Sequence, residues 1–280
     1  MNPVAAFTAA MLMFRSAPPP PRPAALHFSG EARVLAFTRT TGFRHDSIPD
    51  ALDALRRIGA ESGFDVDATE DPAEFRDANL AAYRAVVFLL TTGDVLDAEG
   101  RSALERFIAS GGGWVGVHSA SDTEYDWPFY GRLVGEYFAG HPAIQSATVH
   151  VEDRAHPATA ALPEIWPRTD EWYNFRASPR SSVHVLASLD EGTYSGGSMG
   201  TDHPIAWCHE FAGGRAIYTA GGHTRESYTE PLFVAHLAGA VRWAAGLETG
   251  YCGPQPRPTP GLNERRSRAP RIVTPRRESD

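Results

Sequence analysis

Histidines follow several apolar, strand-like segments of the chain. His118 ends the buried run 114–117 and small polar residues follow it, whereas His223 follows another apolar run across two glycines. His45 lies in the polar loop after the run 33–38. Ligands of open parallel sheets bind outside the carboxyl ends of the strands. We therefore expect His45, His118 and His223 to line one pocket, although they are far apart in the sequence.

A further polar segment, residues 168–175, places two acids before two large aromatic residues. Asp170 and Glu171 precede Trp172 and Tyr173. Paired acids beside aromatic faces suit a polyol, which offers hydroxyl donors and apolar ring faces, and they also suit a metal ion. Surface acids beside core aromatics are an equally good interpretation of the same residues.

Histidines and carboxylates are the available catalytic groups, which favours acid–base or metal-assisted chemistry on a neutral polar substrate. The predicted catalytic residues are His118, His223, Glu171 and His45. The predicted substrate-binding residues are Arg44, Ser119, Asp122, Asp170, Trp172, Tyr173 and Thr224. Asp122, four residues after His118, is expected to orient its imidazole.

Three imidazoles with a carboxylate suit zinc or another late divalent ion. The predicted metal ligands are His45, His118 and His223, with Glu171 as the carboxylate. No two of these histidines share a short spacing, so only the tertiary fold would assemble the site. Metal-free catalytic histidines are the alternative, and no other cofactor is predicted.

Composition excludes several classes of chemistry. All 26 basic residues are arginine, which excludes a lysine Schiff base, a lysine general base and a P-loop lysine. The sequence contains no HExxH motif, and its glycine-rich runs GGG and SGGSMG lack the strand–turn–helix context of a dinucleotide-binding site. Residues 31–252 carry 31 acids against 17 arginines, so nucleic acid is not an expected partner.

The two cysteines, Cys208 and Cys252, form no metal-binding pair and no evident disulfide framework. We expect two free thiols in a reducing compartment, hence a cytoplasmic protein. Residues 4–14 are apolar and of signal-peptide length, but no positive charge precedes them, so secretion is the less favoured alternative. No segment approaches the roughly 18 apolar residues of a membrane span, and a membrane is not an expected partner.

Proline-rich and arginine-rich stretches delimit one domain. We expect residues 1–30 to be disordered, residues 31–252 to form one α/β domain, and residues 253–280 to form a disordered tail. Apolar runs predict buried strands at 33–38, 84–90 and 114–117, and 64–70 is predicted as a half-exposed strand, with helices at 47–63 and 97–113 between them. This alternation predicts a mainly parallel sheet with helices on both faces. Strand-like segments at 146–152, 183–189, 204–211 and 215–220 predict an added antiparallel portion before a closing helix at 230–246.

The segments TGFRHDSI, GGGWVGVHSASDT, DEWYNF and HPIAWCHEFAGGRAIYTAGGHT occur in order along the chain. Together they resemble the ThuA-like family, named for trehalose utilisation, over about residues 33–246. The resemblance implies a flavodoxin-like, class I glutamine amidotransferase-like three-layer sandwich. It places His118 where amidotransferases have the nucleophilic cysteine, and His223, with Glu226 beyond it, near their base. Glutamine hydrolysis through a thioester is then excluded, because imidazole cannot replace the thiolate.

The resemblance implies an enzyme of carbohydrate metabolism that acts on a sugar or keto-disaccharide by acid–base chemistry. A non-catalytic sugar-binding domain is the alternative. Histidines that converge with carboxylates would favour catalysis, and an open groove with exposed aromatic residues would favour binding. The expected partner is a small carbohydrate, and the sequence does not identify which one. The sequence also does not decide between a monomer and a homo-oligomer.

Overall fold

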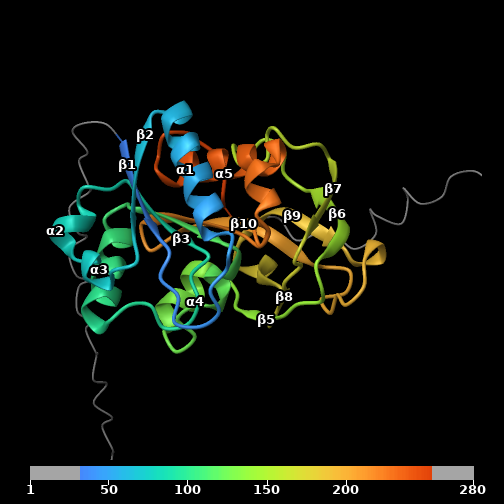
Figure 1. Ribbon diagram of the computed structural model, residues 1–280, viewed down its shortest axis with the longest axis horizontal. Coiled ribbons are helices and arrows are strands. Elements are labelled where there is room, and N and C mark those ends of the chain that lie inside the picture. The colour runs from blue at the N-terminus through green and yellow to red at the C-terminus, as the bar shows by residue number, and fades with distance from the viewer. Residues whose placement is uncertain (1–31, 254–280) are drawn as a thin grey trace, which may run out of the picture.

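The computed structural model of the chain describes residues 32–253. The segments expected to be disordered, 1–30 and 253–280, lie outside the described residues except for Gly253. The described residues form a nine-stranded mixed sheet and a small two-stranded sheet (Figure 1).

One half of the large sheet is parallel. It contains, in spatial order, β2 (Phe64–Thr69), β1 (Ala32–Phe37), β3 (Ala85–Leu89), β4 (Gly113–Val117) and β11 (Gly214–Thr219). All four neighbouring pairs in this half are parallel. Both β3 and β4 are buried along their whole length, as strands covered on both faces should be. This strand order is that of flavodoxin-like sheets, so the predicted fold class is confirmed.

The other half is antiparallel. It continues from β11 with β10 (Pro204–Phe211), β9 (His184–Asp190), β6 (Gln145–Val151) and β7 (Ile165–Asp170). The separate small sheet pairs β5 (Phe138–Gly140) with β8 (Asn174–Phe175). The added antiparallel portion is therefore confirmed, although the sequence did not predict β5, β7 or β8.

Helices cover both faces of the sheet. In Figure 1, α1 (Ile48–Ser62) lies beside α5 (Pro231–Ala244), while α3 (Ala98–Ala109) and α4 (Pro128–Val134) lie on the other side of the sheet. The short helix α2 (Asp77–Leu80) packs on α3. Single 3₁₀ turns occupy Pro72–Glu74, His118–Asp122, Pro179–Ser181, Glu191–Thr193 and Glu226–Thr229.

The helices α1 and α3 begin differently. The side chain of Asp97 accepts a hydrogen bond from the backbone N–H of Gly100 at 2.6 Å, which satisfies an amide at the start of α3. Ser47 occupies the cap position of α1, but its side chain makes no capping hydrogen bond. Its hydroxyl instead donates to the carbonyl of His223 at 2.7 Å. Ser47 thus ties the start of α1 to the loop after β11.

The two cysteines are joined by a disulfide, so the expectation of free thiols was wrong. Cys208 on β10 and Cys252 are 44 residues apart in sequence, yet their Cα atoms lie 5.6 Å apart. The sequence did not reveal this because the chain returns to β10 only after α5. The argument for a reducing compartment therefore loses its support. Among the described residues, no helix is long and apolar enough to cross a lipid bilayer.

Candidate active site

The three histidines predicted to share a pocket do meet at one edge of the sheet. His45 follows β1, His118 follows β4 and His223 follows β11. Glu171, directly after β7, joins them, and one ligand atom from each of the four residues lies within 4.8 Å of every other. We call these four residues the His–Glu cluster. Its assembly confirms the prediction that the carboxyl ends of separate strands bring these side chains together.

His118 sits in a constrained turn. Its φ of +52° lies in the left-handed region, which non-glycine residues rarely adopt. Its Nδ1 donates to the carbonyl of Ala220 at 2.8 Å, and its own carbonyl accepts from the hydroxyl of Tyr218 at 2.8 Å. Tyr173 packs on the imidazole with ring centroids 4.1 Å apart. These contacts fix the ring so that Nε2 faces the cluster, 3.1 Å from Nδ1 of His223.

Asp170 holds the turn that presents His223. Its carboxylate accepts from the backbone N–H groups of Gly222 and His223 at 2.7 and 3.1 Å. Gly222 has a φ of +108°, a conformation that favours glycine. Arg168 neutralises Asp170 through a 2.8 Å contact, and both side chains are buried. Asp170, predicted as a substrate-binding residue, is thus occupied in positioning His223.

This contact also shows how the antiparallel half reaches the site. Four strand spacings separate β7 from β11, about 19 Å in a flat sheet. The Asp170 carboxylate nevertheless touches the loop after β11, and Arg168 contacts Ser227 and Glu230, which directly precede α5. The antiparallel half therefore curls back over the carboxyl edge, which carries Glu171 to the histidines.

His45 is buried, with 4% of its surface exposed. Its ring lies edge-on to His118 and His223, with centroid distances of 4.9 and 5.0 Å. Its Nδ1 is buried and has no hydrogen-bond partner among the described residues. A buried polar atom without a partner is costly, which suggests that a bound group completes the site.

The carboxylate of Glu171 is shared by the imidazoles. Oε2 lies 3.0 Å from Nδ1 of His223 and 3.4 Å from Nε2 of His118. Oε1 lies 3.0 Å from Nδ1 of His141. His141 was not predicted as a site residue. In the sequence, His141 stands out only as part of the turn-like segment Gly140–Pro142, and no recognisable strand precedes this segment.

Electrostatics divide the cluster into charged and neutral members. Burial alone would raise the pKa of the Glu171 carboxyl, but the close contacts with His118 and His223 outweigh burial and hold it well below its usual range. Burial would likewise lower the pKa of His223, but the contact with Glu171 raises it. Burial, together with the neighbouring His118 and His223, lowers the pKa of His45 to about 3. His45 is therefore neutral at pH 7, with a lone pair available for bonding.

Two expected carboxylate contacts are not made. Asp122 does not orient His118; its carboxylate accepts from the hydroxyl of Tyr125 at 2.6 Å, while the Ala220 carbonyl orients the imidazole. Glu226 is exposed, and the carboxylate beside His223 is that of Glu171. The expectation for Asp122 relied on closeness in sequence and that for Glu226 on the family resemblance, whereas the actual partner in each case follows a distant strand.

The remaining predicted binding residues lie around the cluster, and their roles stay predictions. Arg44 is exposed and pairs with Glu70 at 2.6 Å. Trp172 is fully buried and donates to the carbonyl of Gln145. The Ser119 hydroxyl is buried without a partner among the described residues, and Thr224 contacts Ser227 at 3.0 Å.

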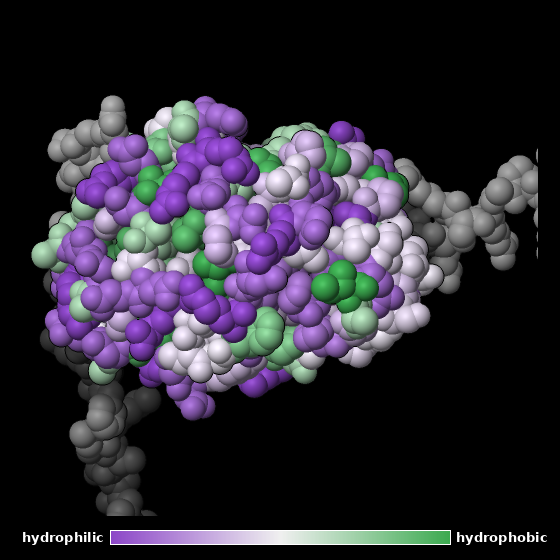
Figure 2. Space-filling view, viewed as in Figure 1, coloured by the Kyte–Doolittle hydropathy of each residue, from purple (hydrophilic) through white to green (hydrophobic). Residues whose placement is uncertain are grey.

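Aromatic rings lie beside the cluster. Phe43 has 66% of its surface exposed and packs edge-on against His45, with centroids 4.9 Å apart. Phe138 packs on Tyr173 with centroids 4.3 Å apart. Figure 2 shows a mainly hydrophilic face on which hydrophobic residues are scattered in small groups. Phe43 therefore places an exposed aromatic ring directly beside the buried imidazole of His45.

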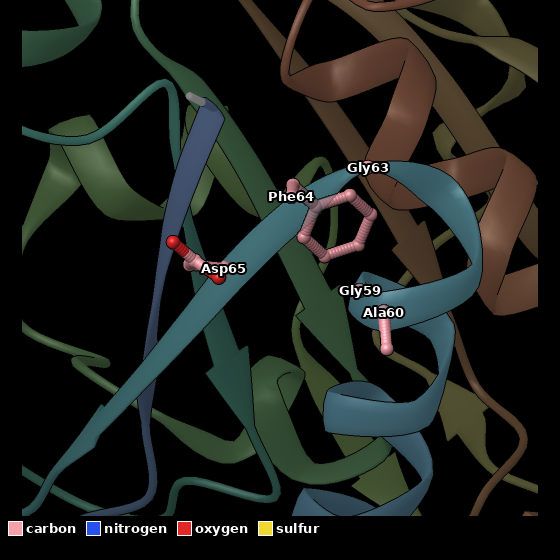
Figure 3. Close-up of a pocket in the computed structure, with 5 residues that line it drawn as sticks. All are labelled: Gly59, Ala60, Gly63, Phe64 and Asp65. Atoms are coloured by element: carbon pink, nitrogen blue, oxygen red, sulfur yellow. The ribbon is translucent and has the colours of Figure 1, made fainter. Parts of the chain in front are cut away.

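Two surface hollows lie elsewhere. One, of about 210 Å³, lies where α1 ends and β2 begins, so it opens at the amino edge of the parallel strands (Figure 3). Its lining residues are Gly59, Ala60, Gly63, Phe64 and Asp65. The other, of about 550 Å³, lies beside β9 and includes His150, Asp190 and Glu191. Neither includes a residue of the His–Glu cluster.

Within residues 32–253, two groups of side chains are close enough to hold a metal ion: the His–Glu cluster and the set His156, Cys208 and Cys252. In the second group both sulfur atoms are taken up by the disulfide. The His–Glu cluster keeps all its ligand atoms available.

Comparisons with known proteins agree with this architecture. The family model for ThuA, trehalose utilisation, matches residues 33–244. A ThuA-like protein of Bacteroides uniformis ATCC 8492 has a similar structure, with 26% identity and a TM-score of 0.64; the match covers 76% of this chain and 91% of that one. A ThuA-like protein of Parabacteroides merdae ATCC 43184 has 20% identity and a TM-score of 0.63, with 79% and 92% covered. No curated protein matches the chain. Since the family model spans most of the described residues, the chain belongs to the ThuA family of trehalose utilisation.

Proposed function

We propose that this protein is an enzyme of carbohydrate metabolism that acts on a sugar or a keto-disaccharide, with a divalent metal ion held by the His–Glu cluster. One observation carries the proposal: three imidazoles and a carboxylate from four separate strand ends converge within 4.8 Å. Family membership supports the carbohydrate, because the family is described by trehalose utilisation.

The spacing of the ligand atoms supports a metal ion. Zinc binds imidazole nitrogen and carboxylate oxygen at about 2.0–2.2 Å, so tetrahedral ligands lie roughly 3.4 Å apart, and ligands at right angles about 3.0 Å apart. The contacts among His118, His223 and Glu171 are 3.0, 3.1 and 3.4 Å. His118 uses Nδ1–H on a backbone carbonyl, so its neutral ring offers the Nε2 lone pair, an arrangement common for metal-bound histidines. The unpartnered Nδ1 of His45 points to the same conclusion.

The chain's own residues would then divide the work. When bound, the ion would act as a Lewis acid on a sugar carbonyl or hydroxyl oxygen. Glu171 and the three imidazoles would hold it, and Asp170 and Tyr173 would keep His223 and His118 in place. The exposed ring of Phe43 offers an apolar surface to a sugar ring.

Two alternatives use the same residues. In a metal-free enzyme, the His223–Glu171 pair would transfer protons directly. In a non-catalytic protein, the site would only bind a sugar. The convergence of histidines with a carboxylate supports catalysis over simple binding, since binding a neutral sugar does not need a buried charged pair. Cysteine-dependent glutamine hydrolysis is not proposed, because Cys208 and Cys252 are bonded to each other.

The expected partner remains a small carbohydrate rather than nucleic acid or membrane. Assembly into a homo-oligomer remains a possible state of the protein. The cytoplasmic location stays a prediction that the disulfide weakens, because such bonds persist mainly in oxidising compartments. Because both cysteines are buried, alkylation of thiols in denaturant, directly after lysis of the cells that produce the protein naturally, tests this point. A protein with two alkylated cysteines would support the cytoplasm, and one with none would support an exported protein.

Elemental analysis of the full chain, purified without a histidine tag, tests the metal. We expect about one divalent ion per chain in the wild type and a strong loss in His118→Ala. His150→Ala, a half-exposed histidine on β6, is the matched control and should keep the metal. Equal metal in all three proteins, or none in the wild type, would refute the metal site. A panel of trehalose, other disaccharides and their 3-keto derivatives, assayed with and without metal, then tests the substrate class.

A further inference from the structure

His141 lies outside the His–Glu cluster but contacts one of its members. It belongs to the loop after β5, and 41% of its side chain is exposed. Its Nδ1 lies 3.0 Å from Oε1 of Glu171 and 3.0 Å from the carbonyl oxygen of Pro142. Of the described residues outside the cluster, it is the histidine in contact with the Glu171 carboxylate.

These two contacts determine which ring nitrogen carries the proton. Both neighbours of Nδ1 are oxygen atoms that only accept hydrogen bonds. An unprotonated Nδ1 would therefore place its lone pair against two others. His141 thus carries its proton on Nδ1, which it shares between Pro142 and Glu171. This assignment holds for the neutral ring and for the charged one.

The contact divides the two oxygens of Glu171 between different neighbours. Oε1 faces His141, whereas Oε2 faces His118 and His223. Tyr173 connects the two sides, because it packs on His118 at 4.1 Å and on His141 at 5.9 Å between ring centroids. Phe138 packs on His141 at 5.8 Å. The plane of the His141 ring is therefore fixed although its edge is exposed.

We propose that His141 is a positioning residue for metal binding: its Nδ1–H engages Oε1 of Glu171 and leaves Oε2 as the single carboxylate ligand. The inference rests on the proposed metal site and adds a residue that acts on the ion only through Glu171. A carboxylate held in this way loses less freedom when it binds a metal. Partners that orient metal ligands typically contribute 10- to 100-fold to metal affinity.

Titration of the metal-free full chain with Co²⁺, followed by visible absorption, tests the proposal. We expect His141→Ala to weaken Co²⁺ binding 10- to 100-fold. Its visible spectrum should also change, because a released Oε1 can become a second carboxylate ligand. His141→Asn places a side-chain N–H near the position of Nδ1, and it should restore most of the affinity and the wild-type spectrum. His150→Ala should behave as the wild type.

The outcomes separate this inference from the proposed function. If the wild type binds Co²⁺ and His141→Ala binds it with unchanged affinity and spectrum, the positioning role is wrong and the metal site stands. If His141→Asn is as weak as His141→Ala, the Nδ1–H contact is not the cause and the inference is likewise overturned. If the wild type itself binds no Co²⁺, the metal proposal fails and this inference fails with it. Thermal unfolding of each variant checks the fold.

Discussion

Removal of the Cys208–Cys252 disulfide should destabilise the protein strongly. The bond closes a loop of 44 residues that contains β11, the His223 turn and α5. Loop-closure entropy for such a loop is roughly 13 cal/mol/K, or about 4 kcal/mol at 25 °C. For a domain of this size, about 4 kcal/mol corresponds to a fall in Tm of roughly 8–16 °C.

Guanidinium unfolding of oxidised and reduced wild-type protein measures this difference. Because both cysteines are buried, the disulfide must be reduced in denaturant and the protein refolded in reductant. The two forms have the same side chains, so their difference in unfolding free energy isolates the cross-link. The double variant Cys208→Ala/Cys252→Ala provides a second comparison that needs no reductant.

A reduced protein within about 1 kcal/mol of the oxidised one would refute the entropic reasoning. Two titratable thiols in the unfolded, untreated protein would show instead that the bond does not form. Only the second result would restore the expectation of free thiols in a reducing compartment.

Three further predictions concern buried and exposed residues of the domain. Burial lowers the pKa of His236 from 6.5 to about 4, so the unfolded chain takes up a proton at this residue first. The contribution of His236 to the unfolding free energy should therefore fall by about 2 kcal/mol between pH 7.5 and 5, and His236→Asn should remove this part of the pH dependence in urea unfolding. Asp170→Asn removes one of the two carboxylates that pair with the buried Arg168, the other being Glu230, and we expect a loss of about 2 kcal/mol in the same assay; a loss below about 1 kcal/mol would contradict the role given to this pair. Phe43→Ala should weaken binding of the sugar found in the substrate panel by about fivefold without changing Tm, whereas Tyr251→Ala, a similarly exposed aromatic residue, should leave binding unchanged.

Much of the fold was predictable because buried parallel strands leave an unmistakable apolar pattern. The runs that became β3 and β4 are apolar along their whole length, and each follows a helix or precedes one. β7 left no such pattern. Its residues alternate between exposed and buried, and Pro167 interrupts it, as is tolerated on the edge strand that β7 is. The edge position thus explains why the sequence did not reveal it.

The site was predictable to the extent that strand ends determine it. His45, His118 and His223 each follow a recognisable strand, so their meeting could be inferred from topology alone. The individual contacts that these histidines make could not be inferred in this way. His141 follows only the short strand β5, and the partner of His118 is a backbone carbonyl, which carries no residue-specific signal. The pairing of Cys208 with Cys252 likewise depends on the path of the chain after α5.

The turn at His118 bears on whether the site is functional. A non-glycine residue in the left-handed region costs of order 1–3 kcal/mol, and such residues cluster at active sites. Here the conformation is stabilised by the Tyr218 hydroxyl and the Ala220 carbonyl, and its effect is to direct Nε2 at Glu171 and His223. A core histidine that only satisfied its own hydrogen bonds would need neither the strained backbone nor a carboxylate brought back from the far edge of the sheet. The strain and the curled antiparallel half therefore serve the same end, the placement of one imidazole nitrogen within a set of ligands.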